Sequence, residues 1–183
     1  MNYSEIKTCD IANGPGVRTS IFVSGCRNKC PDCFNPETWG FKSGKLFTED
    51  TINYIIETME PNYVDGLSIL GGEPLEPENQ FTVLQLINKV KYVYPKKTIW
   101  LWTGFVWEDI LNNPDCRANS FITHTIISDV DVVVDGPFEK DKKDLMLRFK
   151  GSSNQRLIDI HKSCATNEVV IWHDDAIFEK HEW

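Results

Sequence analysis

GCRNKCPDCF, residues 25–34, places Cys26, Cys30 and Cys33 in one short loop. Half of the six cysteines of the chain lie here, separated by three residues and then by two. Thiolates this close together are typical of one metal centre and not of a disulfide framework. Three thiolates leave one coordination position open, so the rest of the sequence must explain the missing ligand.

Length and composition describe one ordinary domain. The 183 residues fall short of the roughly 250 residues of a complete eight-fold β/α barrel. The chain is 41% hydrophobic, and 19 Lys and Arg against 27 Asp and Glu give a net charge of -8. Nucleic acids and anionic membranes attract cationic surfaces, so neither is expected as a partner. We predict a single domain over residues 1–183, in which 158–183 form a C-terminal tail of undefined role.

The first residues, MNYSE, lack the basic and apolar segments of a signal peptide, and no stretch approaches the roughly 20 apolar residues of a membrane span. We therefore expect a cytoplasmic protein with reduced thiols, in which the cysteine loop is metal-binding or catalytic. Cys9, Cys116 and Cys164 are isolated in the sequence and are expected to be inert, as free cysteines usually are.

Strand-like and helix-like patterns alternate along the chain. Strands are predicted at 18–23, 66–70, 98–103, 130–134 and 169–172, and helical spacing of apolar residues at 48–59, 81–93 and 157–160. This alternation predicts an α/β fold with a mainly parallel sheet. Trp100 and Trp102 share one face of their strand, where core packing is expected. Arg18, at the start of the first strand, is either a surface residue or a contact to a partner or cofactor.

Several strands end in glycine or a polar residue. Gly71-Gly72-Glu73 follows the second strand, Thr103-Gly104 ends the third, and Asp135-Gly136 follows the fourth. Ligands of parallel sheets bind at the carboxyl ends of the strands. These segments and the cysteine loop are therefore expected to converge on one edge of the sheet.

The ligand set favours an iron–sulfur cluster over a zinc ion. A structural zinc site needs a fourth Cys or His at motif spacing, and none lies near Cys33. A cluster held by three thiolates, with one iron left free, fits the loop. A zinc ion completed by a distant histidine, and a redox dithiol of Cys30 and Cys33, stay open as alternatives.

Two motifs together resemble the radical S-adenosylmethionine (SAM) superfamily: the spacing of the three cysteines directly after a first strand, and LGGEPL, residues 70–75, at the end of the second. The resemblance implies a [4Fe-4S] cluster whose open iron binds the methionine part of SAM. It also implies a partial, open β/α barrel of about six mainly parallel strands, of the radical SAM type.

The closer resemblance is to the activating enzymes of anaerobic (class III) ribonucleotide reductase, and it spans residues 1–157. It rests on NGPGVR at 13–18, NPETW at 35–39, WLWTGF at 100–105, VDG at 134–136 and GSSNQR at 151–156. In that family the reduced cluster cleaves SAM to methionine and a 5′-deoxyadenosyl radical, which removes a Cα hydrogen from a glycine near the C-terminus of the reductase. The resemblance implies an oxidoreductase that generates this glycyl radical. Its implied partners are the large subunit of the reductase and a low-potential electron donor such as flavodoxin or ferredoxin.

The resemblance also implies roles for individual residues. Cys26, Cys30 and Cys33 are the implied iron ligands; Gly71, Gly72 and Glu73 contact the methionine amino group; the backbone of Asp32, Cys33 and Phe34 lies against the adenine; Thr103, Asp135, Ser152 and Asn154 lie near the ribose or carboxylate. For the last four residues a turn or capping role is the alternative. Asp135 is also a candidate for organising a cation.

Two other functions remain open. The first is another radical SAM enzyme, either a different glycyl-radical activase or a modifier of small molecules. The second is a non-catalytic protein whose cysteine loop holds zinc or a cluster for structure or electron transfer. Zinc without iron or sulfide in anaerobically purified protein would favour a non-catalytic zinc protein.

Cys30→Ala is expected to abolish SAM cleavage, because it removes an iron ligand, whereas Cys116→Ala is expected to leave cleavage largely intact. The measurement is the methionine and 5′-deoxyadenosine formed by the reduced, anaerobically reconstituted protein. Equal loss of cleavage in both variants would contradict this division of the cysteines.

Overall fold

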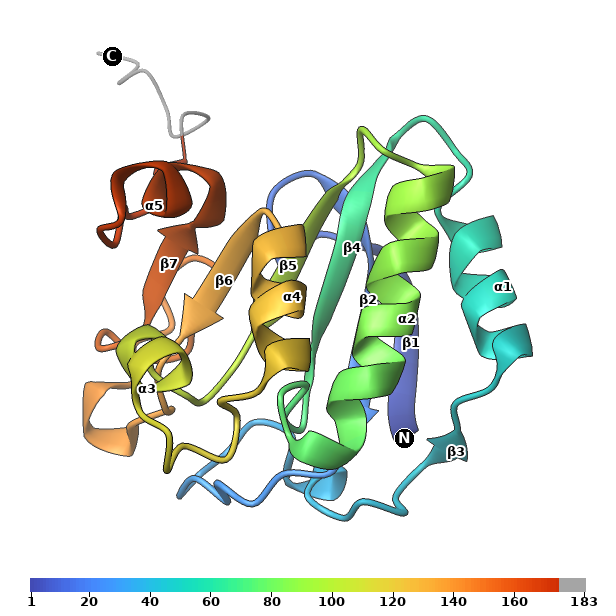
Figure 1. Ribbon diagram of the computed structural model, residues 1–183. Helices are drawn as coiled ribbons and strands as arrows, with labels where there is room; N and C mark the ends of the chain where they lie inside the picture. Colours follow the sequence, from blue (N-terminus) through green and yellow to red (C-terminus); the bar gives the residue numbers. More distant parts are fainter. Residues whose placement is uncertain (175–183) are drawn as a thin grey trace, which may run out of the picture.

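The computed structural model describes residues 1–174 and contains one seven-stranded sheet in the order β3-β1-β2-β4-β5-β6-β7 (Figure 1). The strands are β1 Asn2–Asp10, β2 Val17–Ser24, β3 Lys45–Leu46, β4 Val64–Gly71, β5 Thr98–Trp102, β6 Val132–Asp135 and β7 Arg156–Asp159. The helices are α1 Glu49–Thr58, α2 Pro77–Val93, α3 Trp107–Asn112, α4 Phe121–Asp129 and α5 Ile160–Thr166, with short 3-10 turns at Pro36–Thr38 and Lys140–Lys142. Residues 175–183, the end of the predicted tail, lie outside the described residues.

The middle of the sheet is parallel. Strands β2, β4, β5 and β6 run in one direction, whereas β1, β3 and β7 pair antiparallel to their neighbours. The predicted α/β class is confirmed, but the sheet is parallel only in its middle and not mainly parallel throughout. The strand number is seven and not about six, because β1 and β3 extend one edge and β7 the other. Within residues 1–174 the two edge strands β3 and β7 do not pair with each other, so no closed barrel forms there.

The C-terminal end of the described chain differs from the prediction. Residues 157–160 were expected to be helical, but Leu157 and Ile158 lie in β7 and the helix α5 begins only at Ile160. Successive side chains of a strand point to opposite faces of the sheet, and this explains the difference. Leu157 and Ile158 are buried in separate clusters on the two faces. The strand predicted at 169–172 is reduced to a single bridge between Ile158 and Ile171.

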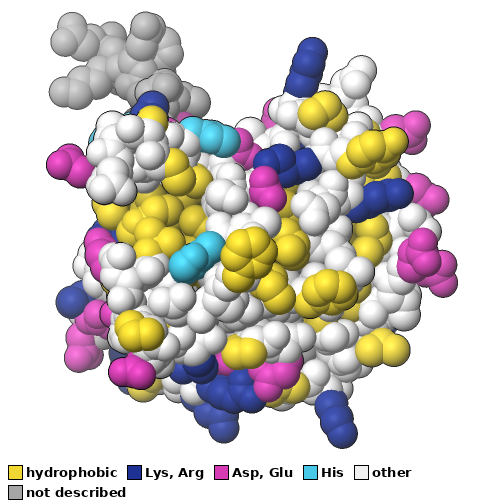
Figure 2. All heavy atoms as spheres, in the orientation of Figure 1, with side chains coloured by type: hydrophobic (Ala, Val, Ile, Leu, Met, Phe, Trp, Pro, Cys, Tyr) yellow, Lys and Arg dark blue, Asp and Glu magenta, His cyan; other side chains and the backbone are white. Residues whose placement is uncertain are grey.

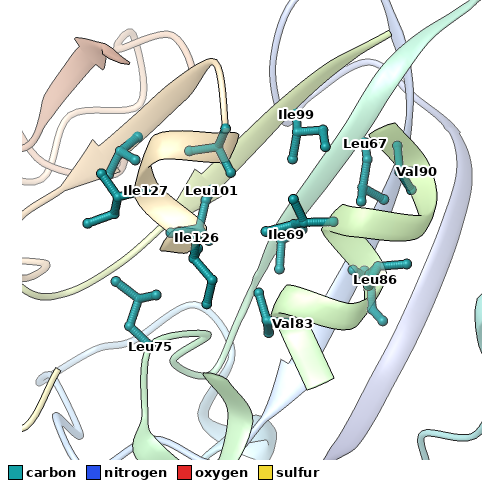
Figure 3. Close-up of a cluster of buried hydrophobic side chains, with 14 of the residues drawn as sticks. Leu67, Ile69, Leu75, Val83, Leu86, Val90, Ile99, Leu101, Ile126 and Ile127 are labelled. Atoms are coloured by element: carbon teal, nitrogen blue, oxygen red, sulfur yellow. The ribbon is translucent and has the colours of Figure 1, made fainter. Parts of the chain in front are cut away.

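Helices cover one face of the sheet and form the main core with it (Figure 3). Alternate strand residues such as Leu67, Ile69, Ile99 and Leu101 point toward Val83, Leu86 and Val90 of α2 and Ile126 and Ile127 of α4. The helix α2 starts with a proline, which lacks an N–H that would be unpaired at that position. None of the helices in residues 1–174 is both long and apolar enough to cross a membrane.

The opposite face of the sheet carries a smaller aromatic cluster. Trp100 is buried with Val132, Val134 and Leu157, as the prediction of core packing requires. The ring of Trp100 meets those of Phe149 and Trp172 edge to face, with centroids 5.4 Å and 4.8 Å away. This face also bears Arg18, whose side chain is wholly buried and so is not a surface residue.

The guanidinium of Arg18 is held by neutral oxygen atoms. It donates hydrogen bonds to Ser68 Oγ at 2.7 Å, Leu67 O at 2.7 Å, and both Thr98 Oγ1 and Thr98 O at 2.9 Å and 3.0 Å. Burial lowers the pKa of Arg18 to about 10, which keeps the group charged at neutral pH. Arg18 therefore ties β2 to β4 and β5 from the face without helices.

Arg18→Ala is expected to lower the free energy of unfolding by about 3 kcal/mol, since it leaves buried acceptors unpaired and creates a cavity. Urea unfolding followed by circular dichroism measures the change. The exposed Lys89 on α2 supplies the control, and Lys89→Ala should change stability by less than about 0.5 kcal/mol. Similar losses in the two variants would contradict the structural role of Arg18.

Candidate iron–sulfur and cofactor site

The cysteine loop and the loops after the parallel strands meet around one cavity of about 530 Å³. Cys26, Cys30 and Cys33 all line it. The end of β4 contributes Gly71, and the loop after it contributes Gly72 and Glu73. The loop after β5 contributes Thr103 and Gly104, and the loop after β6 contributes Gly136. The structure therefore brings together segments far apart in the sequence, as parallel strands ending at one edge allow.

The loop turns tightly around its cysteines. The Cys33 N–H donates to Cys30 O at 3.1 Å, and Lys29 and Asp32 have φ angles of 45° and 57°, in the left-handed region that residues other than glycine rarely adopt. Cys26 is buried, whereas Cys30 and Cys33 are half-buried. The three sulfur atoms are thus presented by a compact segment directly after β2.

In the metal-free chain, the thiols of Cys26 and Cys30 favour their protonated form. Burial raises the pKa of Cys26 to about 11 and also raises that of Cys30. The nearby Glu73 carboxylate adds to both shifts. Binding of iron must therefore displace protons from these thiols.

The three thiols are the donor type that iron–sulfur clusters take in proteins. Within residues 1–174, no group of three or more His, Cys, Asp or Glu side chains is placed to hold one metal ion. The alternative of zinc completed by a distant histidine finds no such group in this part of the chain. Cysteines that hold an iron–sulfur cluster bind separate irons and need not converge on one point.

Glu73 joins three of the loops. Its side chain is wholly buried, and Oε1 accepts hydrogen bonds from Thr103 Oγ1 at 2.8 Å and the Leu75 N–H at 3.0 Å. Oε2 accepts from the Gly104 N–H at 2.8 Å and Asn28 Nδ2 at 3.3 Å. Burial raises the pKa of Glu73 to about 7, against the lowering effect of these donors. Contact with a methionine amino group stays a prediction for this carboxylate.

The glycines before Glu73 let two strand ends approach one another. Gly71 has a φ of +108°, and a Cβ on it would lie 2.7 Å from the backbone of Phe22. A Cβ on Gly72 would lie 2.8 Å from the carbonyl oxygen of Gly25. The close approach that glycine allows here is to β2 and the start of the cysteine loop, in addition to any bound ligand.

The residues expected beside the adenine lie in two different settings. Phe34 lines the cavity, and its ring meets that of Phe138 edge to face at 5.2 Å. Asp32 does not line the cavity but forms an exposed ion pair with Lys140 at 2.8 Å. Only the backbone of Asp32 was assigned to the adenine, and this assignment stays a prediction.

Of the four residues expected near the ribose or carboxylate, Thr103 lines the cavity. Asp135 accepts hydrogen bonds from the Trp107 N–H at 2.8 Å and Arg156 Nε at 3.0 Å. The Ser152 hydroxyl accepts the Glu139 N–H at 3.2 Å, and Asn154 Nδ2 donates to Pro137 O at 2.8 Å. These three residues do not line the cavity, and their contacts match the turn or capping alternative. Their roles at the cofactor, including a cation at Asp135, stay predictions.

Several cavity residues were given no role at the site from the sequence. They are Lys7, Ala12, Asn13, Asn28, Asn35, Trp39, Trp102, Phe138, Leu145, Leu147, Phe149, Gly151 and Gln155, among others. Asn28 could have been found, because it lies between two of the cysteines. The segment 144–151 carries no recognisable ligand pattern and reaches the cavity only through the fold.

The fold and cavity define an α/β protein whose cysteine loop is suited to an iron–sulfur cluster, and the family described as 4Fe-4S single cluster domain matches residues 12–158. The chain is 40% identical over 157 residues to the anaerobic ribonucleoside-triphosphate reductase-activating protein of Enterobacteria phage T4, which covers 86% of this chain and 93% of that protein. The Escherichia coli K12 protein of the same name is 38% identical over 157 residues, covering 85% of this chain and 96% of its own length. No solved structure matches. The chain belongs to the family of anaerobic ribonucleoside-triphosphate reductase-activating proteins.

The raised pKa of Glu73 predicts a pH-dependent stability of the cluster-free protein. The carboxyl group ionises near 4.5 when unfolded and near 7 when folded, so the folded chain holds an extra proton between these values and loses stability as pH rises. Compared with Glu73→Gln, the parent should lose about 2–3 kcal/mol of unfolding free energy between about pH 5 and about pH 8.

Urea unfolding at several pH values measures this difference, and Glu78→Gln is the control. Hydrogen bonding to Arg27 lowers the pKa of Glu78 to about 2, so that carboxylate does not titrate in the same range. Equal pH slopes for the parent and Glu73→Gln would show that Glu73 does not titrate near neutral pH.

Proposed function

We propose that this protein activates an anaerobic ribonucleotide reductase by generating a glycyl radical on it. The observation that carries the proposal is that all three cysteines and the Glu73 carboxylate line one cavity. The curated relatives, matched over about 85% of this chain, carry the name of reductase-activating proteins. The radical SAM mechanism and the partial-barrel description are part of the proposal.

When bound and reduced, the cluster would supply the electron for cleavage of SAM to methionine and a 5′-deoxyadenosyl radical. This radical would remove one of the two Cα hydrogens of a glycine in the C-terminal region of the reductase. In this proposal Cys26, Cys30 and Cys33 hold three irons and leave the fourth open. An electron donor such as flavodoxin or ferredoxin reduces the cluster.

The chain's own residues would bind and orient the cofactor. The cavity volume of about 530 Å³ lies within the usual range of small-molecule sites, about 300–1,000 Å³. The Glu73 carboxylate would accept charge-assisted hydrogen bonds from the methionine amino group, and a cation bound there would favour its ionised form. Phe34, Phe138 and Trp102 supply apolar wall on the same cavity.

The open sheet is consistent with a protein substrate. The cavity is bounded on one side by the ends of the strands and on another by the segment that includes Leu145, Leu147 and Phe149. A glycine carried by another protein must enter such a cavity from outside, and a closed barrel would restrict that entry. A sheet whose edge strands β3 and β7 do not pair with each other therefore supports a macromolecular substrate.

The test is to incubate the reduced, reconstituted protein with SAM and the reductase under anaerobic conditions. A glycine-centred EPR doublet is expected on the reductase, because the radical couples to the remaining Cα hydrogen. Reductase labelled with deuterated glycine is the matched control, and its doublet should collapse.

Each other outcome identifies one of the alternatives. Cofactor cleavage without a glycine signal on the reductase would indicate another radical SAM enzyme. Protein that binds zinc and no iron, and that leaves SAM intact, would indicate a non-catalytic role.

A further inference from the structure

A second buried carboxylate, Glu76, lies at the start of α2 and contacts the cysteine loop. Its side chain is wholly buried, although it occupies the N-cap position of the helix. It makes no capping hydrogen bond to its own helix. A buried charge must be paired and hydrogen-bonded, so the partners of Glu76 indicate which groups this side chain positions.

The partners of Glu76 come from two other segments. Oε1 accepts the backbone N–H of Arg27, the residue after Cys26, at 2.8 Å, and Oε2 accepts Arg27 Nη1 at 2.8 Å. From the segment between α3 and α4, Arg117 donates through Nε to Oε2 at 3.1 Å and through Nη2 to Oε1 at 3.1 Å. Glu76 is thus clamped between two guanidinium groups and one backbone amide.

The two arginines are themselves held by aromatic rings and polar groups. Arg27 lies over the ring of Phe41 at 4.4 Å, and Arg117 lies over that of Phe105 at 4.6 Å. Arg117 also donates to Asn28 Oδ1, so the two residues that follow Cys26 are both fixed. Figure 2 shows Lys and Arg side chains gathered beside acidic ones at the lower edge, near the start of α2.

The two halves of the cysteine loop are held differently. Around Cys26, the Gly25 N–H donates to Thr38 O at 2.7 Å, and the Cys26 N–H donates to Trp39 O at 3.1 Å. The next N–H, that of Arg27, donates to the Glu76 carboxylate. Around Cys33, the backbone bonds are local, with the Cys33 N–H bound to Cys30 O and the Asn35 N–H lying 3.4 Å from Cys33 Sγ. The first half is therefore preformed by the protein.

We propose that Glu76 is a positioning residue that fixes Cys26 before the cluster is present, through the Arg27 amide and the Arg27 and Arg117 side chains. The inference rests on the proposed iron–sulfur function. Residues that orient a ligand from behind affect metal affinity by about 10–100-fold when they are replaced. Glu76 also places one negative charge beside two positive ones next to the cluster loop, so its loss makes the surroundings of the cluster more positive.

Glu76→Gln and Glu78→Gln form a matched pair, because both carboxylates bind the Arg27 side chain. Glu78 is 49% exposed and accepts no backbone amide of the loop, whereas the Glu76 side chain is 0% exposed. Glu76→Gln should lose its cluster to an iron chelator at least about tenfold faster than the parent. Its cluster should have a more positive midpoint potential, and in the cluster-free protein the Arg27 amide should exchange hydrogen faster. Glu78→Gln should stay within about twofold of the parent in chelator loss.

The destabilised variant Arg18→Ala, whose side chain does not contact the loop, separates positioning from general stability. Equal cluster loss and potentials in the two glutamine variants would overturn the proposal. The proposal would also be overturned if Glu76→Gln and Arg18→Ala, at equal thermal stability, lost the cluster at the same rate and Glu76→Gln left the hydrogen exchange of the Arg27 amide unchanged. Glu76 would then have only a structural role. A parent protein that binds no cluster would instead overturn the proposed function, and this inference with it.

Discussion

The buried carboxylate of Glu73 joins the loops after three neighbouring parallel strands. It accepts hydrogen bonds from Asn28 in the cysteine loop after β2 and from Thr103 and Gly104 after β5, while Glu73 itself follows β4. Such an arrangement requires that the strand ends lie close together, and Gly71 and Gly72 permit this because no Cβ separates β4 from β2. The cavity exists because these loops are held at one edge.

Two buried carboxylates at this edge of the sheet differ in whether an arginine pairs with them. Glu73 lacks an arginine partner among its hydrogen bonds, and burial raises its pKa to about 7. Glu76, equally buried, is paired with Arg27 and Arg117. Glu73 is thus suited to receive a cationic ligand group, whereas Glu76 is already paired with two arginines of the protein.

Much of this site could be predicted from local sequence. The cysteine spacing and the glycine-glycine-glutamate element each lie within a short segment, and strand periodicity located β2, β4, β5 and β6 to within a few residues. The strand β1, which lies between β3 and β2, escaped prediction because its residues are largely half-buried or exposed and lack a clear apolar pattern. Arg18 and Glu76 could not be assigned because their partners lie far along the chain. Arg18 binds residues between Leu67 and Thr98, and Glu76 binds Arg117.

The proposed function requires three thiolates that hold a cluster with one open iron. Mössbauer spectroscopy of the iron-57-labelled, anaerobically reconstituted protein tests this most directly. Adding SAM should change the signal of one iron of a four-iron cluster and leave the other three nearly unaltered. A spectrum that SAM does not change, or protein that retains zinc and no iron, would contradict the account.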